Sequence, residues 1–237
     1  MVLPIDDHNR FYISEDRRQQ PREYFKFLVQ QAQPRLAMPS PRVLDIGCAT
    51  GDFLYFLRTL YPDASLTGID LEPEFVARAS QAVPDADFTT ADIFSGANLP
   101  ADKFDLVFMS GFNYLFSQYE PWIRNVVSLT RYSAYVFGWF NPEDLDVRAT
   151  VQRSGDNASS TPWNLISRRS ISLFLDSLHL RHQFIGWELP IANPRCKEDP
   201  IRSWTIEQKD GHFLVVNGTQ MIQRFALLRI DVAVPAP

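Results

Sequence analysis

The segment 43–51 (VLDIGCATG) restricts the fold of this chain more than any other part of the sequence. An apolar run ends at Ile46, glycines follow at Gly47 and Gly51, and residues 52–60 then carry apolar side chains at helical spacing. Glycine lets the backbone approach a ligand closely, and a helix N-terminus offers unpaired N–H donors. The segment therefore predicts a strand, a ligand-binding turn and a helix, the alternative being a turn that needs glycine for its geometry alone.

The same alternation of strand and helix continues along the chain. Strand-like apolar runs occur at 65–69, 86–90, 104–109, 132–138 and 181–187, and helical patterns at 16–33, 73–82, 118–129 and 167–178. Strands that alternate with helices form a parallel sheet that is covered on both faces. The sequence thus predicts an α/β, doubly wound, mostly parallel sheet.

The last third of the chain has a different pattern. Residues 201–217 contain two strand-like runs around Lys209-Asp210-Gly211, which predicts a β-hairpin insertion, and 224–232 predicts a final strand. Residues 139–166 are a long polar stretch that we expect to be a loop, and loops of that length are more often functional than accidental.

Composition limits the classes of partner. The 237 residues carry a net charge of −5, so there is no basic footprint for nucleic acid, and we expect a single domain with no nucleic-acid partner. No run of about 18 apolar residues or signal-like leader occurs, which predicts a soluble protein with no membrane partner. Cys48 and Cys196 are the only cysteines, too few for a disulfide framework or a zinc motif, and a cytoplasmic location fits best.

The charge of the glycine loop indicates which ligand it binds. The pyrophosphate of a dinucleotide needs donors and positive potential, whereas this loop begins with the carboxylate of Asp45. The spacing also departs from G-x-G-x-x-G. S-adenosylmethionine (SAM) has no phosphate, and the ammonium and sulfonium groups of its methionine end suit an acid at this place.

Two further acids follow neighbouring strands. Asp70 ends the second strand, where a carboxylate can accept hydrogen bonds from both ribose hydroxyls of an adenosine, although a helix cap is an equally good reading of Asp70 alone. Asp92 follows the third strand, where it could accept from an adenine amino group while the Ile93 N–H donates to the ring. The alternative for Asp92 is a solvated loop acid.

Taken together, VLDIGCATG, LTGID, ADIF and FDLVFM resemble the ordered motifs of class I SAM-dependent methyltransferases, strongly over residues 42–138. The resemblance implies a seven-stranded sheet with an antiparallel last strand, a transferase activity and SAM as cofactor. It places the methionine end at Asp45, Gly47 and Gly51, the ribose at Asp70, and the adenine at Asp92 and Ile93. The predicted cofactor-binding set also contains Cys48, Ala49, Leu71 and Ser110. Ala49 departs from the family, which more often has glycine there.

The acceptor side is less defined. We expect residues 1–41 to form an N-terminal helical segment and 42–138 the cofactor-binding core. The loop 110–118 and the acceptor-side segments 139–166 and 188–222 should form the acceptor pocket, with Trp139, Trp163, Trp187 and Trp204 in its walls and with Tyr12 and the adjacent N-terminal helix at its remaining side. No residue identifies itself as a catalytic base, and the candidates are His8, Asn113, Tyr114 and His212. No carboxylate follows the fourth strand to hold a metal, so we expect none.

These features predict methyl transfer to an oxygen or nitrogen of a small-molecule acceptor, such as a sugar or a secondary metabolite. Two alternatives remain: a SAM-binding or scaffold protein without turnover, and a nicotinamide-dependent oxidoreductase on the same architecture. The sequence leaves the oligomeric state open between monomer and homodimer.

Overall fold

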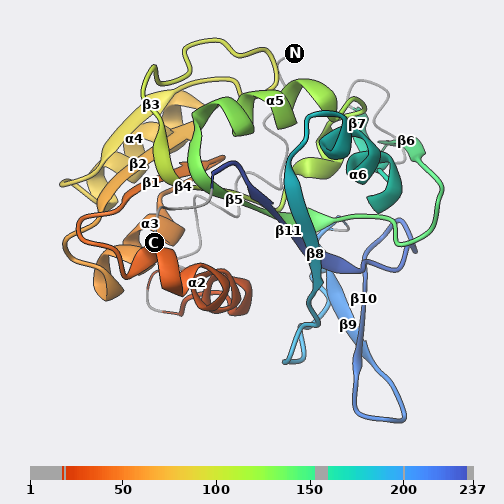
Figure 1. The fold of residues 1–237 in the computed structure, drawn as a ribbon. Helices are drawn as coiled ribbons and strands as arrows, with labels where there is room; N and C mark the ends of the chain where they lie inside the picture. The colour runs from red at the N-terminus through yellow and green to blue at the C-terminus, as the bar shows by residue number, and fades with distance from the viewer. Residues whose placement is uncertain (1–17, 19, 153–159, 200, 234–237) are drawn as a thin grey trace.

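The fold, seen in a computed structural model that describes residues 18, 20–152, 160–199 and 201–233, is built on one seven-stranded sheet (Figure 1). The strand order is β3-β2-β1-β4-β5-β11-β8. The members are β1 (Arg42–Ile46), β2 (Ser65–Asp70), β3 (Asp87–Thr90), β4 (Phe104–Ser110), β5 (Thr130–Trp139), β8 (Arg181–Gly186) and β11 (Phe225–Asp231). Strands β1 to β5 run parallel to one another, and β11 runs antiparallel to both β5 and β8. The predicted doubly wound sheet with an antiparallel last strand is confirmed.

Helices cover both faces because the strands are apolar on both sides. In β4 all residues from Phe104 to Met109 are buried, and all but Asp105 are apolar, which is typical of a strand between two helical layers. The helices are α2 (Glu23–Leu36), α3 (Asp52–Leu60), α4 (Pro73–Ala82), α5 (Glu120–Leu129) and α6 (Arg168–Ser177). Side chains of α2 and α3 share one buried cluster with the sheet, and α5 and α6 share another.

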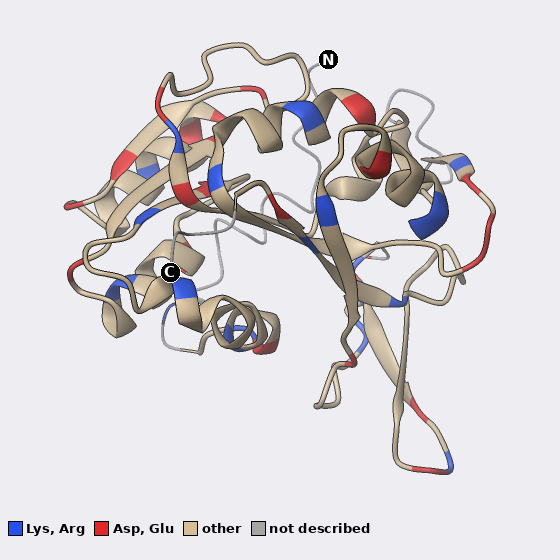
Figure 2. Ribbon diagram, viewed as in Figure 1, with Lys and Arg blue, Asp and Glu red and all other residues tan. Residues whose placement is uncertain are grey.

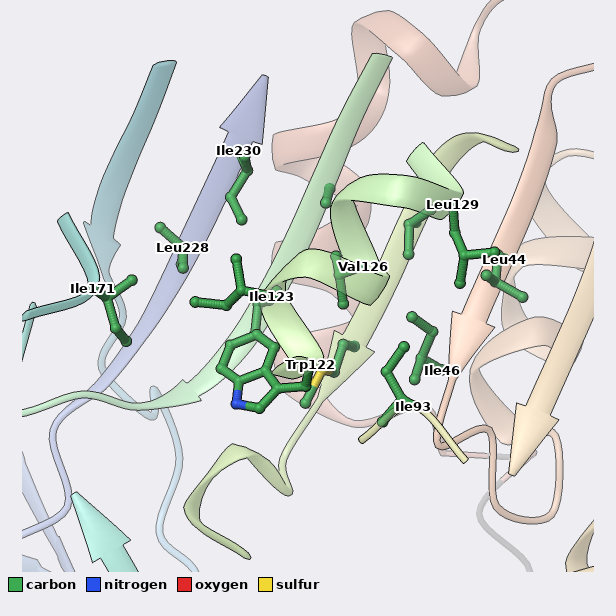
Figure 3. Packing of buried hydrophobic residues seen from close by; sticks show 14 of the residues in the cluster. Leu44, Ile46, Ile93, Trp122, Ile123, Val126, Leu129, Ile171, Leu228 and Ile230 are labelled. Carbon is green, nitrogen blue, oxygen red and sulfur yellow. The ribbon is translucent and has the colours of Figure 1, made fainter. Parts of the chain in front are cut away.

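The centre of the second cluster is the buried face of α5. Trp122, Ile123 and Val126 follow helical spacing and point at the sheet, where they meet residues of β1 and β11 (Figure 3). Each of these three side chains is at most 1% exposed. Full burial of such side chains contributes roughly 1.5–3 kcal/mol each, so this face anchors the strands that carry the site described below.

Two hairpins extend from the sheet. The predicted C-terminal hairpin is confirmed as β9 (Trp204–Glu207) and β10 (Phe213–Val216), which are paired antiparallel. The expectation of a loop over 139–166 is wrong in part, because β6 (Val147–Gln152) and β7 (Ser160–Leu165) pair antiparallel within it. Both hairpins lie at the end of the sheet where β11 begins (Figure 1).

The N-terminal helix differs in its limits from the predicted 16–33. It begins at Glu23, directly after Pro21 and Arg22, and it continues through Pro34 to Leu36. Pro34 lies in the last turn of the helix, where the hydrogen bond that its missing N–H cannot form is followed by only two more helical residues. Phe25, Leu28 and Ala32 are buried as their spacing predicts, whereas Tyr24 is partly exposed.

Charged residues are distributed over most of the elements. Basic and acidic positions are interspersed on the helices and on the connecting loops (Figure 2). Within the described residues, no helix combines the length and the apolar composition that a membrane span needs.

Candidate functional site

A cavity of about 230 Å³ lies at the carboxyl ends of the central strands. Its walls come from the ends of β1, β2 and β4 and from the residue stretch after β3. Between β1 and β4 the chain changes the direction in which strands are added to the sheet, from β1-β2-β3 to β4-β5. Ligands of open α/β sheets bind at such a switch point, so the topology alone marks this cavity as the candidate site.

The loop between β1 and α3 forms the floor of the cavity. Gly47 has φ +71°, and a Cβ added there would lie 2.3 Å from Cε1 of Phe112. Gly51 has φ +83° and approaches Ala79 of α4 so closely that an added Cβ would lie 3.1 Å from the Ala79 Cβ. The two glycines are therefore required by backbone conformation and by close packing.

The loop is tied to the end of β2 by a hydrogen bond. The Ala49 N–H donates to Oδ2 of Asp70 at 2.9 Å, and the Glu72 N–H donates to Oδ1 at 3.0 Å. Ala49 itself has φ +45°, in the region that favours glycine. The Asp70 carboxylate keeps further lone pairs, because each of its oxygens can accept more than one hydrogen bond.

Two acids at the floor of the site have raised pKa values. Asp45 is 3% exposed, and no described residue donates a hydrogen bond to it. Burial raises the pKa of the Asp45 carboxyl well above its usual range, and the charge of Asp70 raises it further. Burial also raises the pKa of Asp70, against the opposing effect of the N–H donors from Glu72 and Ala49. Such a pair of buried carboxylates favours a cationic ligand.

The far end of the cavity has the groups that an adenine needs. Asp92 receives hydrogen bonds from the Phe94 N–H and the Ser95 hydroxyl, both at 2.8 Å, which fixes its carboxylate. The Ile93 side chain is buried, and its N–H meets no acceptor among the described residues. Leu71, which also lines the cavity, is 40% exposed. This end of the cavity thus has a hydrogen-bond acceptor in Asp92, a donor in the Ile93 N–H and apolar surface from Leu71.

The remaining predicted cofactor residues also line this cavity. Cys48 is buried, and burial followed by the charges of Asp45 and Asp70 raises the pKa of its thiol, so it remains a neutral thiol. Ser110 ends β4, and its buried hydroxyl oxygen has no partner among the described residues. Every predicted cofactor residue except Gly51 lines this cavity. Gly51 is the N-cap residue of α3.

A second cavity of about 270 Å³ adjoins the first. Arg22, Tyr24, Gly111 and Tyr114 line both cavities, so the two spaces meet at these residues. Residues of all three predicted acceptor-side segments line the second cavity, including Gly111, Trp139, Trp163, Leu189 and Val215.

The tryptophans divide between this cavity and the protein interior. Trp139, Trp163 and Trp187 line the second cavity. Trp204 does not, and it is buried with the Arg195 guanidinium 4.6 Å above its ring. Of the four tryptophans expected in the walls of the acceptor pocket, three thus line this cavity.

The β6–β7 hairpin is fixed to the loop after β4. The Asn164 side chain donates to the Tyr114 carbonyl at 3.0 Å, and the Arg148 side chain donates to the Ser117 carbonyl at 3.0 Å. The Tyr114 ring lies 4.8 Å from Trp139 and 4.5 Å from Trp163. The three rings form one wall, which explains why a segment expected to be a loop is an ordered hairpin.

The catalytic candidates lie in different places. His8, like Tyr12, lies outside the described residues. The Asn113 amide is used in the fold, since it donates to the Trp139 carbonyl at 2.7 Å and accepts from the Trp139 N–H at 3.2 Å. His212 is exposed at the tip of the β9–β10 hairpin beside Glu188, at 3.0 Å, and lines neither cavity. Of the four candidates only Tyr114 is a described residue that lines both cavities.

Sequence reasoning expected the N-terminal helix beside the pocket but did not name Arg22, Tyr24 or Phe112 as site residues. Arg22 and Tyr24 flank Glu23, the first residue of α2, and the sheet topology gives no signal which residues of this helix line the site. Phe112 could have been found from Gly47, because a glycine with positive φ marks a close approach by some neighbour. In the described part of the chain, no group of three or more His, Cys, Asp or Glu side chains is arranged to hold a metal ion.

Comparison with known proteins agrees with this geometry. Residues 43–132 match the family model of a methyltransferase domain. Over these residues the chain is similar to methyltransferase domains. Among curated proteins, a trans-aconitate 2-methyltransferase from Klebsiella pneumoniae (strain 342) is 30% identical over 115 residues, which are 46% of this chain and 45% of the relative. The chain thus matches less than half of that relative's length.

Solved structures share the fold of this chain at low identity. The YcgJ protein of Bacillus subtilis superposes with a TM-score of 0.59 at 16% identity, over 88% of this chain and 98% of that protein. The magnesium protoporphyrin IX methyltransferase of Synechocystis PCC 6803 with bound S-adenosylhomocysteine (SAH) gives 0.56 at 14% identity, over 89% and 83%. At these identities the comparison supports the fold alone.

Proposed function

We propose that this protein is a SAM-dependent methyltransferase that transfers a methyl group to an oxygen or nitrogen of a small molecule held in the second cavity. One observation carries the proposal: an acidic cavity at the switch point of the sheet meets an aromatic cavity at four shared residues. The first cavity suits a cationic cofactor, and the second suits an acceptor whose reacting atom lies at the junction.

The residues of the first cavity fit SAM. The buried carboxylate of Asp45, which receives no hydrogen bond from the described side chains, suits the ammonium group of the methionine end. Asp70 has lone pairs left for the ribose hydroxyls, and Asp92 with the Ile93 N–H matches the hydrogen-bonding edge of adenine. The similarity to a trans-aconitate 2-methyltransferase and to a structure with bound SAH supports the same cofactor.

Methyl transfer demands alignment more than acid–base chemistry. SAM supplies a methyl group on a positively charged sulfur, which the acceptor attacks directly. The protein contributes by holding the two molecules in line and by excluding water from the junction. The buried rings of Trp139 and Trp163 against Tyr114 provide the apolar wall for that exclusion.

A substitution at the ribose position tests the proposal. Asp70→Ala removes charge-assisted hydrogen bonds worth about 1.5–3 kcal/mol each, so SAM affinity measured by calorimetry should fall by at least roughly tenfold to a hundredfold. Asp87→Ala is the matched control, because Asp87 is an exposed acid at the start of the neighbouring strand β3. Equal affinities for both variants would mean that the ribose binds elsewhere.

Turnover separates the enzyme from a binding protein without activity. Purified protein incubated with methyl-labelled SAM and a small-molecule extract should form SAH and labelled product. SAM binding without any transfer would favour the scaffold alternative. Binding of NAD in place of SAM would favour an oxidoreductase.

A further inference from the structure

The two adjoining cavities differ in the sign of their charged residues. Among the described residues, five acids and one arginine line the cofactor cavity, the acids being Asp45, Asp52, Asp70, Glu72 and Asp92. The described lining of the second cavity has two arginines, Arg22 and Arg202, and two acids, Glu23 and Asp199. The acids of the site are therefore concentrated on the cofactor side, and both arginines line the acceptor side.

A basic side chain lines the junction. Of the four described residues that line both cavities, Arg22 is the one with a charged side chain, beside Tyr24, Gly111 and Tyr114. A guanidinium is a rigid fork of N–H donors that matches a carboxylate, and it repels a cationic amine. The reacting atom of the acceptor must lie at this junction if the methyl group comes from the cofactor cavity.

The described residues of the junction include no group that would take a proton from the acceptor. Phenols such as Tyr24 and Tyr114 ordinarily keep their own proton at neutral pH. Glu23 lines only the second cavity and is 2.6 Å from the ammonium of Lys26. Asp199 also lines only the second cavity. An alcohol would need a base at the junction, whereas a carboxylate is ionised at neutral pH and loses no proton when it is methylated.

We propose that the acceptor is a carboxylic acid with an apolar, ring-containing body and that the product is its methyl ester. One carboxylate oxygen forms the new bond to the methyl carbon, the bond from that carbon to sulfur breaks, and its electron pair stays on sulfur. The products are a neutral ester and neutral-sulfur SAH, with no proton or further reactant involved. This inference rests on the proposed function and specifies its acceptor.

The walls of the second cavity determine the body of the acceptor. They are dominated by rings, namely Phe137, Trp139, Trp163, Trp187, Phe225 and Tyr114. Phe137 is stacked on Phe225 with centroids 5.5 Å apart and an interplanar angle of 3°, and Trp187 meets both edge-on at 5.3 and 5.9 Å. Such a wall favours a flat ring over a body with several charged groups.

Arg22 has the role of a binding and positioning residue in this reaction. Its guanidinium would hold one carboxylate oxygen while the other attacks, and the ester that forms has no charge left to hold. Arg22 therefore acts mainly on acceptor binding, and its loss should raise the KM for the acceptor by about tenfold to a hundredfold. The SAM dissociation constant should change less than threefold.

The chemical stability of the product provides the test. The protein is incubated with methyl-labelled SAM and a protein-free small-molecule extract to which 3-phenylpropanoate, 3-phenylpropan-1-ol or 3-phenylpropan-1-amine is added in parallel. Methyl esters release volatile methanol in mild alkali, whereas methyl ethers and methylamines do not. We expect the labelled methyl group to be recovered as methanol after treatment with mild alkali.

Label that stays in alkali-stable products would overturn the inference while supporting the proposed function. SAM binding with no label transferred to any pool would contradict the proposed function itself. For the ring-containing body, 3-phenylpropanoate should compete for transfer at least tenfold better than the aliphatic tricarboxylate trans-aconitate, and the reverse order would overturn that part.

Variants of Arg22 complete the experiment. Arg22→Gln should raise the KM as stated, and Arg22→Lys should restore part of the loss because it keeps the charge without the fork. Arg78→Gln is the matched control, since Arg78 is a half-exposed arginine of α4 that lines neither cavity. An unchanged KM in Arg22→Gln, in a variant that binds SAM normally, would overturn the assignment of Arg22.

Discussion

The Ala49 N–H donates a hydrogen bond to the Asp70 carboxylate at 2.9 Å, which joins the loop after β1 to the end of β2. The acid assigned to the ribose thus also holds the loop assigned to the methionine end. Asp70 is partly buried among these groups, so its hydrogen bonds are partly sheltered from water. The two halves of the cofactor site are therefore joined by this bond, and a substitution of either residue should affect the other.

The first prediction concerns the strained position in this unit. Ala49 has φ +45°, so Ala49→Gly removes a steric cost in the left-handed region and adds chain entropy to the unfolded state. The expected result in urea unfolding is a change between zero and a gain of about 1 kcal/mol, with SAM affinity preserved. A loss of more than about 1 kcal/mol would show that the alanine methyl group contributes packing that outweighs the strain.

A second prediction follows from the buried Asp45. Because burial and Asp70 raise the pKa of its carboxyl in the folded protein, the fold prefers the protonated acid. The unfolding free energy of the ligand-free protein therefore decreases as pH rises from the unfolded pKa, near 3.9, to the raised folded pKa. That cost is fully present only above the raised folded pKa.

Asp45→Asn removes this cost, so the variant without ligand should unfold at higher urea concentration at pH 7, by about 1–3 kcal/mol. The same variant should bind SAM at least tenfold more weakly, because it lacks the charge that faces the ammonium group. Asp92→Asn provides the comparison of an acid in the same cavity. A variant that is both less stable and an unimpaired binder would contradict this role of Asp45.

The third prediction is the pH dependence of binding. An ammonium group next to Asp45 favours the ionised carboxylate, so SAM binding should release protons at pH values near and below the raised pKa of Asp45. The SAM dissociation constant should accordingly increase as pH is lowered from 8 to 5. Calorimetry in buffers of different ionisation enthalpy would measure the released protons, and Asp45→Asn should abolish the release. A dissociation constant that is the same at both pH values would contradict the proposal.

Most of the cofactor half could be predicted from the sequence because its signals are local. The apolar runs before Gly47, Asp70 and Asp92 mark strands, and parallel strands bring their carboxyl ends to one edge. The acids at those ends then had to meet, and the structure places them in one cavity.

The acceptor half was less predictable, for physical reasons. Residues of β6 alternate between partly buried and exposed, a weak pattern, and β7 contains Pro162, which usually argues against a strand. The hairpin forms because Trp163 and Asn164 pack on Tyr114, and such a long-range contact has no local sequence signal. Arg22 likewise comes to the site through the packing of α2 on the sheet, which spacing along the chain does not reveal.

The central claim is that the cavity at the ends of β1, β2 and β4 binds SAM, and thermal unfolding with ligands tests it most directly. SAM or SAH at about 100 times its dissociation constant should stabilise the fold by about 2.7 kcal/mol. For a chain of this length that is an increase in Tm of roughly 5–10 °C, with no increase from NAD at the same concentration. An increase with NAD and none with SAM or SAH would contradict the account.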